Sequence, residues 1–118
     1  MDVMQLRRNL LLAGKKKSKN LLDPAYRDES FRDNIFYYRD SPLKLEPNTY
    51  TMSCSIQCTG LYVVSGGSNL FVKYNNTALT FTLTESKEVS FNFYKSNIDH
   101  TADCQLEVGS QATPYEPY

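Results

Sequence analysis

Three cysteines and a single histidine are the residues of this 118-residue chain best suited to nucleophilic, redox or soft-metal chemistry. Cys54 and Cys58 are four residues apart, so in an extended strand their Cα atoms would lie about 13 Å apart, at roughly 3.3 Å per residue. That distance is too long for a disulfide, which needs less than about 7 Å, and too long for one shared metal ion. Both cysteines fall on the apolar side of an alternating segment. We therefore expect Cys54, Cys58 and Cys104 to be reduced and buried, although a bridge from either of the first two to Cys104 is geometrically conceivable.

His100 lies in a sequence that is typical of a turn, between residues 97 and 101. A catalytic histidine needs a nucleophile and an orienting acid close by. The chain has no GxSxG motif and no cysteine on a polar face. We therefore interpret His100 as a histidine of a surface loop, and we predict no enzymatic activity, no catalytic residue and no cofactor.

Carboxylates are crowded into a polar, turn-forming segment that precedes position 41. They are Asp23, Asp28, Glu29, Asp33 and Asp40. Loop carboxylates can build a calcium site, which needs about six to eight oxygen ligands. The DxDxDG spacing of such a loop is missing here. A charged, solvated loop is the favoured interpretation, and no metal site is predicted.

Aromatic residues are numerous, with nine tyrosines and six phenylalanines. About half of them fall on the apolar faces of expected strands. Four tyrosines are candidates for an outer face: Tyr37, Tyr38, Tyr62 and Tyr94. Exposed tyrosines on a β-sandwich can stack on sugar rings or anchor a protein interface, and the sequence alone does not separate the two uses.

The zero net charge of the chain conceals an asymmetry between its beginning and the rest. The first twenty residues hold six basic residues and one acidic residue, a net charge of +5, and the other 98 residues carry −5. A basic arm on an acidic body favours contact with an acidic neighbour. The predicted partner-binding residues are Arg7, Arg8, Leu10, Leu11, Leu12, Lys15, Lys16, Lys17 and Lys19. The alternative is a solvated leader sequence with no partner.

Period-two alternation of apolar and polar residues runs through the chain after Pro42. The clearest case is 50–58, which Gly60 is expected to end; 61–64, 70–74, 79–83, 89–93 and 104–108 follow. Turns are expected at 65–69 and at Asn75-Asn76. Many short strands at spacings near ten residues indicate an all-β fold, specifically a single jelly-roll β-sandwich. We assign residues 1–19 to the arm and 20–118 to the sandwich. No apolar run is long enough to span a membrane.

Three segments resemble a known family. Residues 45–53, LEPNTYTMS, resemble an "L-x-P-N-T-x-Y-T-L-S" motif, residues 104–118, CQLEVGSQATPYEPY, resemble an "I-Q-L-E-x-G-x-x-A-T-x-Y-x-P-Y" ending, and residues 8–11 are similar to an "R-N-L-L" opening. Together they resemble the carbohydrate-binding-module-like jelly rolls of phage and prophage minor structural proteins. The matches cover roughly a quarter of the chain, and the ending is the most specific. Members usually carry tryptophan near the sugar face, whereas this chain has none.

The resemblance implies a non-enzymatic virion protein that decorates the head or belongs to the tail or baseplate. Other virion proteins, or further copies of this chain in a homo-oligomer, are the expected partners of the arm. The alternative is a host-adhesion module whose outer tyrosines bind a host-surface glycan. Nucleic acid is a poorer partner, since one short basic cluster is little for a DNA contact. No membrane partner is expected.

Overall fold

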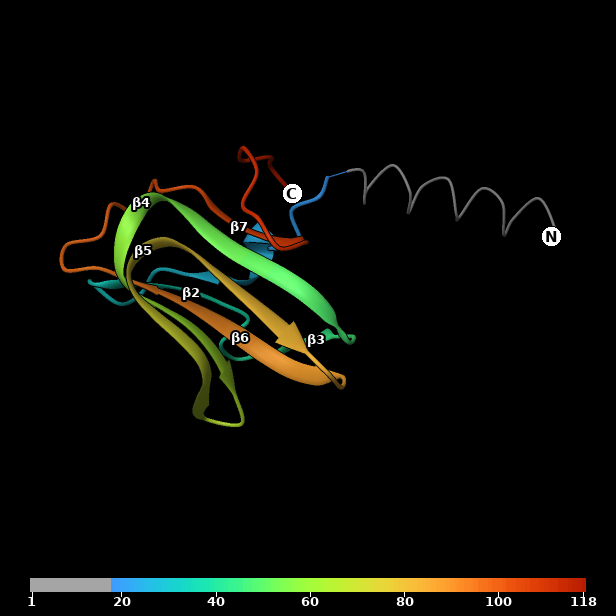
Figure 1. Cartoon of the computed structure of the whole chain (residues 1–118). Helices are drawn as coiled ribbons and strands as arrows, with labels where there is room; N and C mark the ends of the chain where they lie inside the picture. The colour runs from blue at the N-terminus through green and yellow to red at the C-terminus, as the bar shows by residue number, and fades with distance from the viewer. Residues whose placement is uncertain (1–17) are drawn as a thin grey trace, which may run out of the picture.

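Antiparallel strands dominate residues 18–118, the part of the chain that the computed structural model describes (Figure 1). A short 3-10 turn, η1 (Pro24–Tyr26), precedes them. The strands are β1 (Arg27–Asp28), β2 (Asn34–Tyr37), β3 (Leu43–Leu45), β4 (Asn48–Ser65), β5 (Ser68–Leu83), β6 (Lys87–Tyr94) and β7 (Cys104–Val108). The expectation of an all-β fold is confirmed. Within these residues, no helix has the length and apolar character that crossing a membrane requires.

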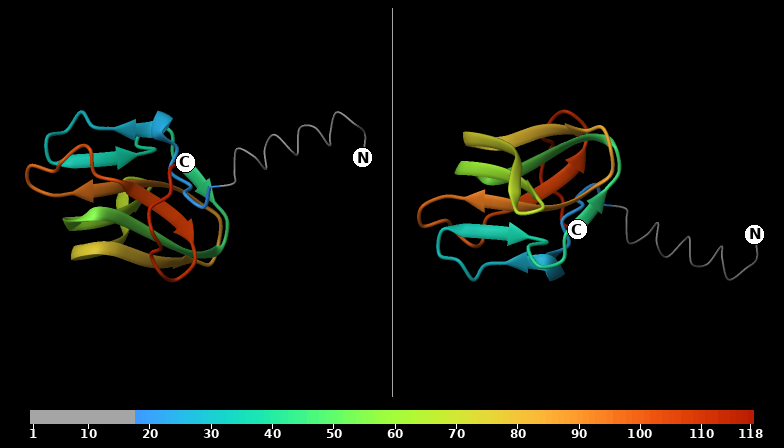
Figure 2. Two further views of the ribbon diagram at one scale, coloured as in Figure 1. Left: turned by 90° about the horizontal axis from the view of Figure 1, so that it is seen from above. Right: turned by 90° about the horizontal axis from the view of Figure 1, so that it is seen from below.

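The long hairpin of β4 and β5 belongs to two layers at once. In the first layer, the beginning of β4 pairs with β7 and with the end of β5. In the second layer the end of β4 pairs with β6 and with the start of β5. β6 pairs in turn with β2 and β3, and β1 lies beyond β2. The hairpin bends between the layers, so one sheet folds over itself into a sandwich-like body (Figures 1 and 2).

Two strand boundaries expected from the sequence are wrong, and both lie near this bend. Gly60 does not end a strand, because β4 continues through it to Ser65. Asn75-Asn76 is not a turn between strands, because β5 runs through both residues. The β4–β5 register shifts between Ser53 and Cys58, and Asn75 takes a φ of 51°. Asparagine tolerates this left-handed backbone better than most residues, so these residues bend the hairpin rather than end it.

The turn expected at 65–69 is confirmed. Ser65 pairs with Ser68, and the two residues between them, Gly66 and Gly67, have φ values of 59° and 79°. Two consecutive positive φ values are those of a type I′ turn, which suits the twist of a tight hairpin. Only glycine and a few polar residues adopt them readily.

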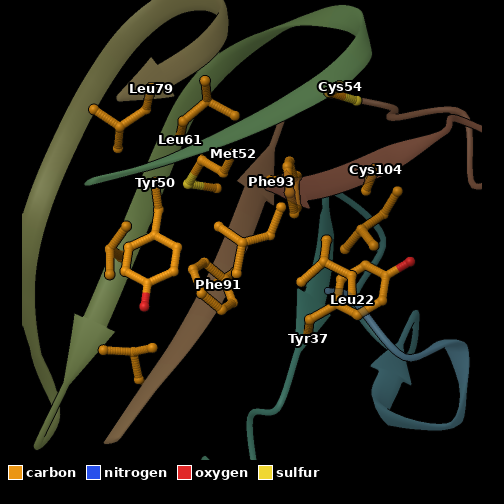
Figure 3. Close-up of a cluster of buried hydrophobic side chains, with 14 of the residues drawn as sticks. Leu22, Tyr37, Tyr50, Met52, Cys54, Leu61, Leu79, Phe91, Phe93 and Cys104 are labelled. Carbon is orange, nitrogen blue, oxygen red and sulfur yellow. The ribbon is translucent and has the colours of Figure 1, made fainter. Parts of the chain in front are cut away.

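The hydrophobic core fills the space between the two layers (Figure 3). Tyr50 of β4 stacks on Phe81 of β5 with ring centroids 5.6 Å apart, and Phe81 contacts Phe91 of β6 at 6.4 Å. Along β4 the buried apolar side chains occupy even positions from Tyr50 to Cys58 and odd positions at Leu61 and Val63. The bend therefore reverses which residues of the strand face the core.

Candidate binding surfaces

Two of the four tyrosines expected on an outer face, Tyr37 and Tyr38, are buried, with exposed fractions of 4% and 5%. The Tyr37 ring packs edge-on against Phe93 at 6.2 Å. Tyr38 follows the end of β2 with a φ of 61°, which brings its side chain inward as well. Its hydroxyl donates to the Leu21 carbonyl at 3.1 Å and accepts from the Asp23 amide at 3.0 Å. Burial raises the pKa of Tyr37 to about 12. The prediction that these two side chains are exposed to a sugar is wrong.

The other two, Tyr62 and Tyr94, are partly exposed, and a third tyrosine lies beside them. Gly60 of β4 pairs with Tyr74 of β5 on one side and with Tyr94 of β6 on the other. Tyr62 lies two residues further along the same face of β4. The Tyr62 and Tyr74 rings meet edge to face at 6.2 Å, and Tyr74 is 64% exposed. We call Gly60, Tyr62, Tyr74 and Tyr94 the aromatic face.

Gly60 makes room for one of these rings. A Cβ atom at position 60 would lie 2.4 Å from the Tyr62 hydroxyl oxygen, so the Tyr62 ring lies over the Gly60 backbone. Partial burial raises the pKa of Tyr62, and the hydroxyls of Tyr74 and Tyr94 raise it further. Asn92 of β6 is the cross-strand partner of Tyr62, and its buried Oδ1 accepts no hydrogen bond from the described residues. The aromatic face therefore presents tyrosine rings to solvent, while the Asn92 acceptor beside it is buried.

Sequence reasoning missed Tyr74. The alternation of Leu70, Val72 and Tyr74 predicts that all three face the core, yet Leu70 and Tyr74 are exposed. Phe71 packs against the core instead. The alternation is real, but the inward positions of β5 are odd on both sides of the bend, at Phe71 and at Leu79, and period-two patterning carries no information on which side is inward.

A hollow with a volume of about 470 Å³ lies between residues 21–26 and 41–45. The exposed Tyr26 ring stacks on Tyr38 at its base, with centroids 4.9 Å apart. Asp23, Lys44 and the C-terminal Tyr118 also line this groove. It offers an aromatic wall next to charged groups, a surface that the sequence did not indicate.

The acidic segment is occupied by contacts within the fold. Its oxygens accept hydrogen bonds from nearby backbone and side chains: Asp23 from the Ala25 amide (2.9 Å), Asp28 from the Ser30 amide (2.9 Å) and hydroxyl (2.6 Å), and Asp33 from the Asn97 amide (2.8 Å). Glu29 forms an ion pair with Arg27. In residues 18–118, no group of three or more histidine, cysteine or carboxylate side chains is placed to hold a metal ion.

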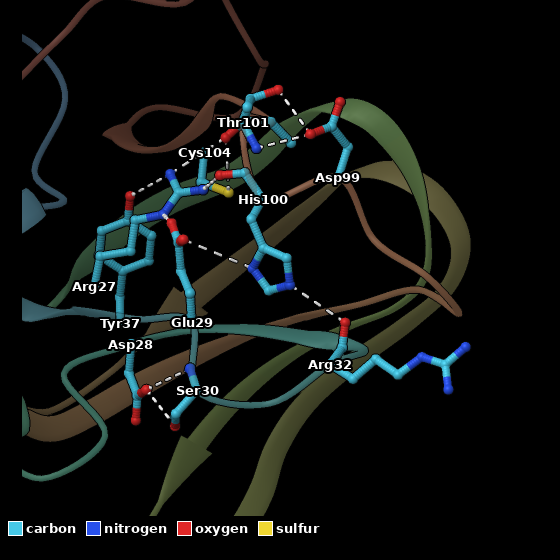
Figure 4. A network of polar contacts seen from close by, with 11 residues as sticks. Arg27, Asp28, Glu29, Ser30, Arg32, Tyr37, Asp99, His100, Thr101 and Cys104 are labelled. Carbon is cyan, nitrogen blue, oxygen red and sulfur yellow. Dashed lines mark hydrogen bonds and ion pairs between the residues drawn. The ribbon is translucent and has the colours of Figure 1, made fainter.

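His100 belongs to a polar network that fixes the loop before β7 (Figure 4). Arg27 donates to the His100 carbonyl at 2.5 Å, to the Ala102 carbonyl at 3.2 Å and to the Tyr37 hydroxyl at 3.3 Å. The His100 ring lies between a Glu29 carboxylate oxygen, 3.8 Å from Nδ1, and the Arg32 carbonyl, 3.3 Å from Nε2. These contacts tie β1 to the loop and give the histidine a structural role.

The three cysteines are free and buried, as expected. The expectation that Cys54 and Cys58 lie far apart is wrong, because β4 bends between them. The thiols of Cys58 and Cys104 donate to the Ile56 and Ala102 carbonyls at 3.8 and 4.0 Å, and the nearby side chains of Cys104 and Cys58 lower the pKa of Cys54. The three sulfur atoms therefore form one cluster.

Most of the predicted arm lies outside the described residues: Arg7, Arg8, Leu10, Leu11, Leu12, Lys15, Lys16 and Lys17. Lys19 is described, and its ammonium donates to the Thr113 hydroxyl and the Pro114 carbonyl. Asn20 and Leu22 follow it and are 3% and 1% exposed. The segment from Lys19 to Leu22, which we call the arm root, is thus bound to the body.

The C-terminal segment is held against β7 by two buried polar side chains, Gln105 and Glu107. Glu107 accepts hydrogen bonds from the Thr113 hydroxyl at 2.6 Å and the Thr113 amide at 3.2 Å. Gln105 donates to the Thr113 carbonyl at 3.2 Å and accepts from the Glu116 amide at 2.9 Å. We call these contacts the tail latch. They explain the glutamine, glutamate and threonine of the ending by structure alone.

Comparisons with protein-family models, curated proteins and solved structures found no match to this chain.

Proposed function

We propose that this chain is a non-enzymatic structural protein of a bacteriophage virion, built on a jelly-roll sandwich and docked through its basic N-terminal arm. It decorates the head or forms an accessory subunit of the tail or baseplate. Its partner is another virion protein or a further copy of itself. The observation that carries the proposal is the arm root, which follows the basic segment in the chain and is bound to the body.

The arm root is held from two sides. The Leu21 amide donates to the Leu106 carbonyl of β7 at 2.8 Å, and the Asn20 Oδ1 accepts from the Leu106 amide at 3.2 Å. Lys19 reaches the tail at Thr113. A partner that binds residues 1–17 would therefore be coupled to the whole body through β7, as a docking arm requires.

The distribution of charge supports contact between the basic arm and an acidic surface of a partner molecule. Residues 1–17 hold five basic residues and one acidic residue, a net charge of +4, whereas residues 18–118 hold eight basic and twelve acidic residues, −4. Opposite charges steer association and are screened by salt. Leu10 to Leu12 add an apolar part to the contact, so added salt weakens it only in part.

Two of the three segments on which the family resemblance rests, residues 45–53 and 104–118, are neighbours in space. Residues Tyr50 to Cys54 of β4 pair with Cys104 to Val108 of β7. The Thr51 hydroxyl also donates to the Gly109 carbonyl at 2.8 Å. These two motifs thus describe one strand pair and the tail above it.

The test is incorporation into particles. Antibodies against the purified chain should label virions of the phage or prophage that encodes it. A variant with Lys15, Lys16 and Lys17 replaced by glutamine should be depleted from those particles. The matched control, Lys73→Gln with Lys95→Gln, removes charge from the body and should be incorporated normally. Virions that lack the wild-type protein would refute the proposal.

The aromatic face favours a second candidate function, binding of a host-surface glycan. Tyrosine rings stack on the apolar faces of sugars. The chain has no tryptophan, so the stacking would rest on Tyr62, Tyr74 and Tyr94.

Screening on a glycan array tests this candidate, followed by one comparison of variants. Tyr74→Ala should abolish binding of any glycan that is found. Tyr115→Ala removes another exposed tyrosine, which is 45% exposed and lies outside the aromatic face, and it should leave binding intact. If Tyr26→Ala removes binding instead, the glycan occupies the groove at Tyr26 and the aromatic face is not the site.

A further inference from the structure

The three thiols lie where β4 bends away from β7, and two of them are cross-strand partners. Cys54 of β4 pairs with Cys104 of β7 in the strand register. Both side chains lie at the same end of the buried cluster (Figure 3). The question is whether this pairing brings the two sulfur atoms into the geometry of a disulfide.

The backbone hydrogen bonds between β4 and β7 show which type of cross-strand pair Cys54 and Cys104 form. The Gly109 amide donates to the Thr49 carbonyl at 2.9 Å, and the Ser55 amide donates to the Asp103 carbonyl at 2.9 Å. Odd-numbered positions of β4 therefore form the hydrogen-bonded pairs with β7. Cys54 and Cys104 form a non-hydrogen-bonded pair, whose Cα atoms lie about 4.5 Å apart. Disulfides span Cα separations of about 4.4 to 6.8 Å, so this pair meets the requirement.

Cys54 is also the thiol that a small reagent can reach. It is 7% exposed, whereas Cys104 is 1% and Cys58 0% exposed. It lines a hollow of about 150 Å³ together with Asp103 and Tyr115, among others. Hydrogen peroxide is small enough to occupy a hollow of this volume.

The thiol cluster favours the reactive form of Cys54. Hydrogen bonds from Cys104 and then Cys58 lower the pKa of Cys54. Hydrogen bonding to Cys54 and burial raise the pKa of the other two thiols. The thiolate is the form of cysteine that reacts with peroxide, so Cys54 is the sulfur that reacts first.

We infer that hydrogen peroxide joins Cys54 and Cys104 in a disulfide that links β4 to β7. The Cys54 sulfur attacks one oxygen of the peroxide, the O–O bond breaks, and a hydroxide leaves and takes up a proton, giving Cys54 sulfenic acid and water. The Cys104 sulfur then attacks the Cys54 sulfur, and the S–O bond breaks. The hydroxyl group leaves with the Cys104 proton as a second water. Two thiols and one peroxide thus give one disulfide and two waters.

The bridge would fix the strand that carries both the tail latch and the arm root, since β7 binds Leu21 through Leu106 and holds the tail through Gln105. It closes a loop of about fifty residues. Loops of that size gain substantial stability from a disulfide, so the unfolding equilibrium constant should fall by at least about tenfold on oxidation. The inference does not depend on the proposed virion function.

Peptide mapping of peroxide-treated full-length protein tests the inference. Thiol titration in denaturant should fall from three thiols to one. Tryptic digestion without reduction should then yield residues 45–73 linked to residues 96–118, with the loss of two hydrogen atoms. Cys58→Ala should keep the link, and Cys54→Ala should abolish it. In Cys104→Ala, a dimedone adduct should appear at position 54.

Three outcomes would overturn the inference: three thiols that persist after oxidation, a bridge inside residues 45–73, or a link between two chains. A disulfide to Cys104 that still forms in Cys54→Ala would also overturn the inference, because its other sulfur would be that of Cys58. The mapping of the wild-type chain decides the first three by itself. Circular dichroism of each variant before oxidation shows whether it is folded, so that a lost link is assigned to the missing sulfur.

Discussion

Gly60 shows how one residue without a side chain shapes a surface. It lies within a strand, where glycine usually weakens pairing, and the ring of Tyr62 lies over its backbone. The rings of the aromatic face therefore depend on a position that carries no ring itself. At the same scale, single carboxylates such as Asp28 and Asp99 fix loops rather than bind ligands.

Gly60→Ala is expected to displace the Tyr62 ring. The new Cβ would meet only the far part of a side chain, so the free energy of unfolding should change by about 1 kcal/mol or less. Binding of any glycan at the aromatic face should nevertheless weaken, because the stacking surface is reshaped. Urea unfolding and a titration with that glycan measure the two effects. A loss of stability of several kcal/mol would mean that the ring cannot move.

Acid should weaken the fold through Asp28 and Asp99. Hydrogen bonds from Ser30 lower the pKa of Asp28, and those from Thr101 lower that of Asp99. A carboxylate with a depressed folded-state pKa stabilises the fold above its ordinary pKa of 3.8, and the benefit is lost as pH falls below that value. The double variant Asp28→Asn/Asp99→Asn should therefore show a shallower decline between neutral pH and about pH 3. Urea unfolding across this range is the measurement, and an unchanged slope would contradict it.

At the scale of the element, β7 organises the molecule more than its five residues suggest. It pairs with β4, binds the arm root through Leu106, and holds the tail through Gln105 and Glu107. Four of its residues are buried, including these two polar side chains. Buried polar groups persist only when they are hydrogen-bonded, so the tail is needed to satisfy them.

Glu107→Gln should open the tail latch. Glu107 accepts from the Gln105 side-chain amide nitrogen at 2.8 Å as well as from Thr113. Glutamine has one acceptor oxygen in place of two, so at least one of these hydrogen bonds must be lost or reversed, and a buried unsatisfied group costs about 1–3 kcal/mol. Chymotrypsin should also cut at Tyr115 faster than in the wild type. Glu85→Gln is the matched control, because Glu85 is an exposed carboxylate that pairs only with Lys87 among the described residues. Equal stability of the two variants would show that the latch contributes little.

At the scale of the whole molecule, the start of the described chain and the C-terminus lie on one side of the body (Figure 1). The described chain begins at residue 18 next to the tail, and the C-terminus lies close to it (Figure 1). The boundary between arm and body, drawn after residue 19 from charge alone, passes through the bound segment. Lys19 contacts the tail, while Asn20 and Leu22 are buried.

Truncation should therefore have two different outcomes. Removal of residues 1–17 should leave a folded, soluble body that no longer joins its partner. Removal of residues 1–22 should also lower the free energy of unfolding by about 1.5–3 kcal/mol, the contribution of burying one leucine, and more from the lost Asn20 hydrogen bonds. Urea unfolding compares the two, and co-sedimentation with particles measures assembly. Normal assembly after removal of residues 1–17 would show that the arm is a leader sequence with no partner.

Local patterning by itself determined the all-β class, the tight turn at Gly66-Gly67 and the burial of the cysteines, because alternation and turn chemistry are properties of neighbouring residues. Only the tertiary structure decided how side chains are arranged around the bend in the β4–β5 hairpin. It brought Cys54 close to Cys58, and it brought Tyr62, Tyr74 and Tyr94 together on one face. A period of two does not say which side of a strand is buried, and the register shift in the hairpin reverses the answer along β4, between Met52 and Leu61, while β5 keeps its odd positions inward.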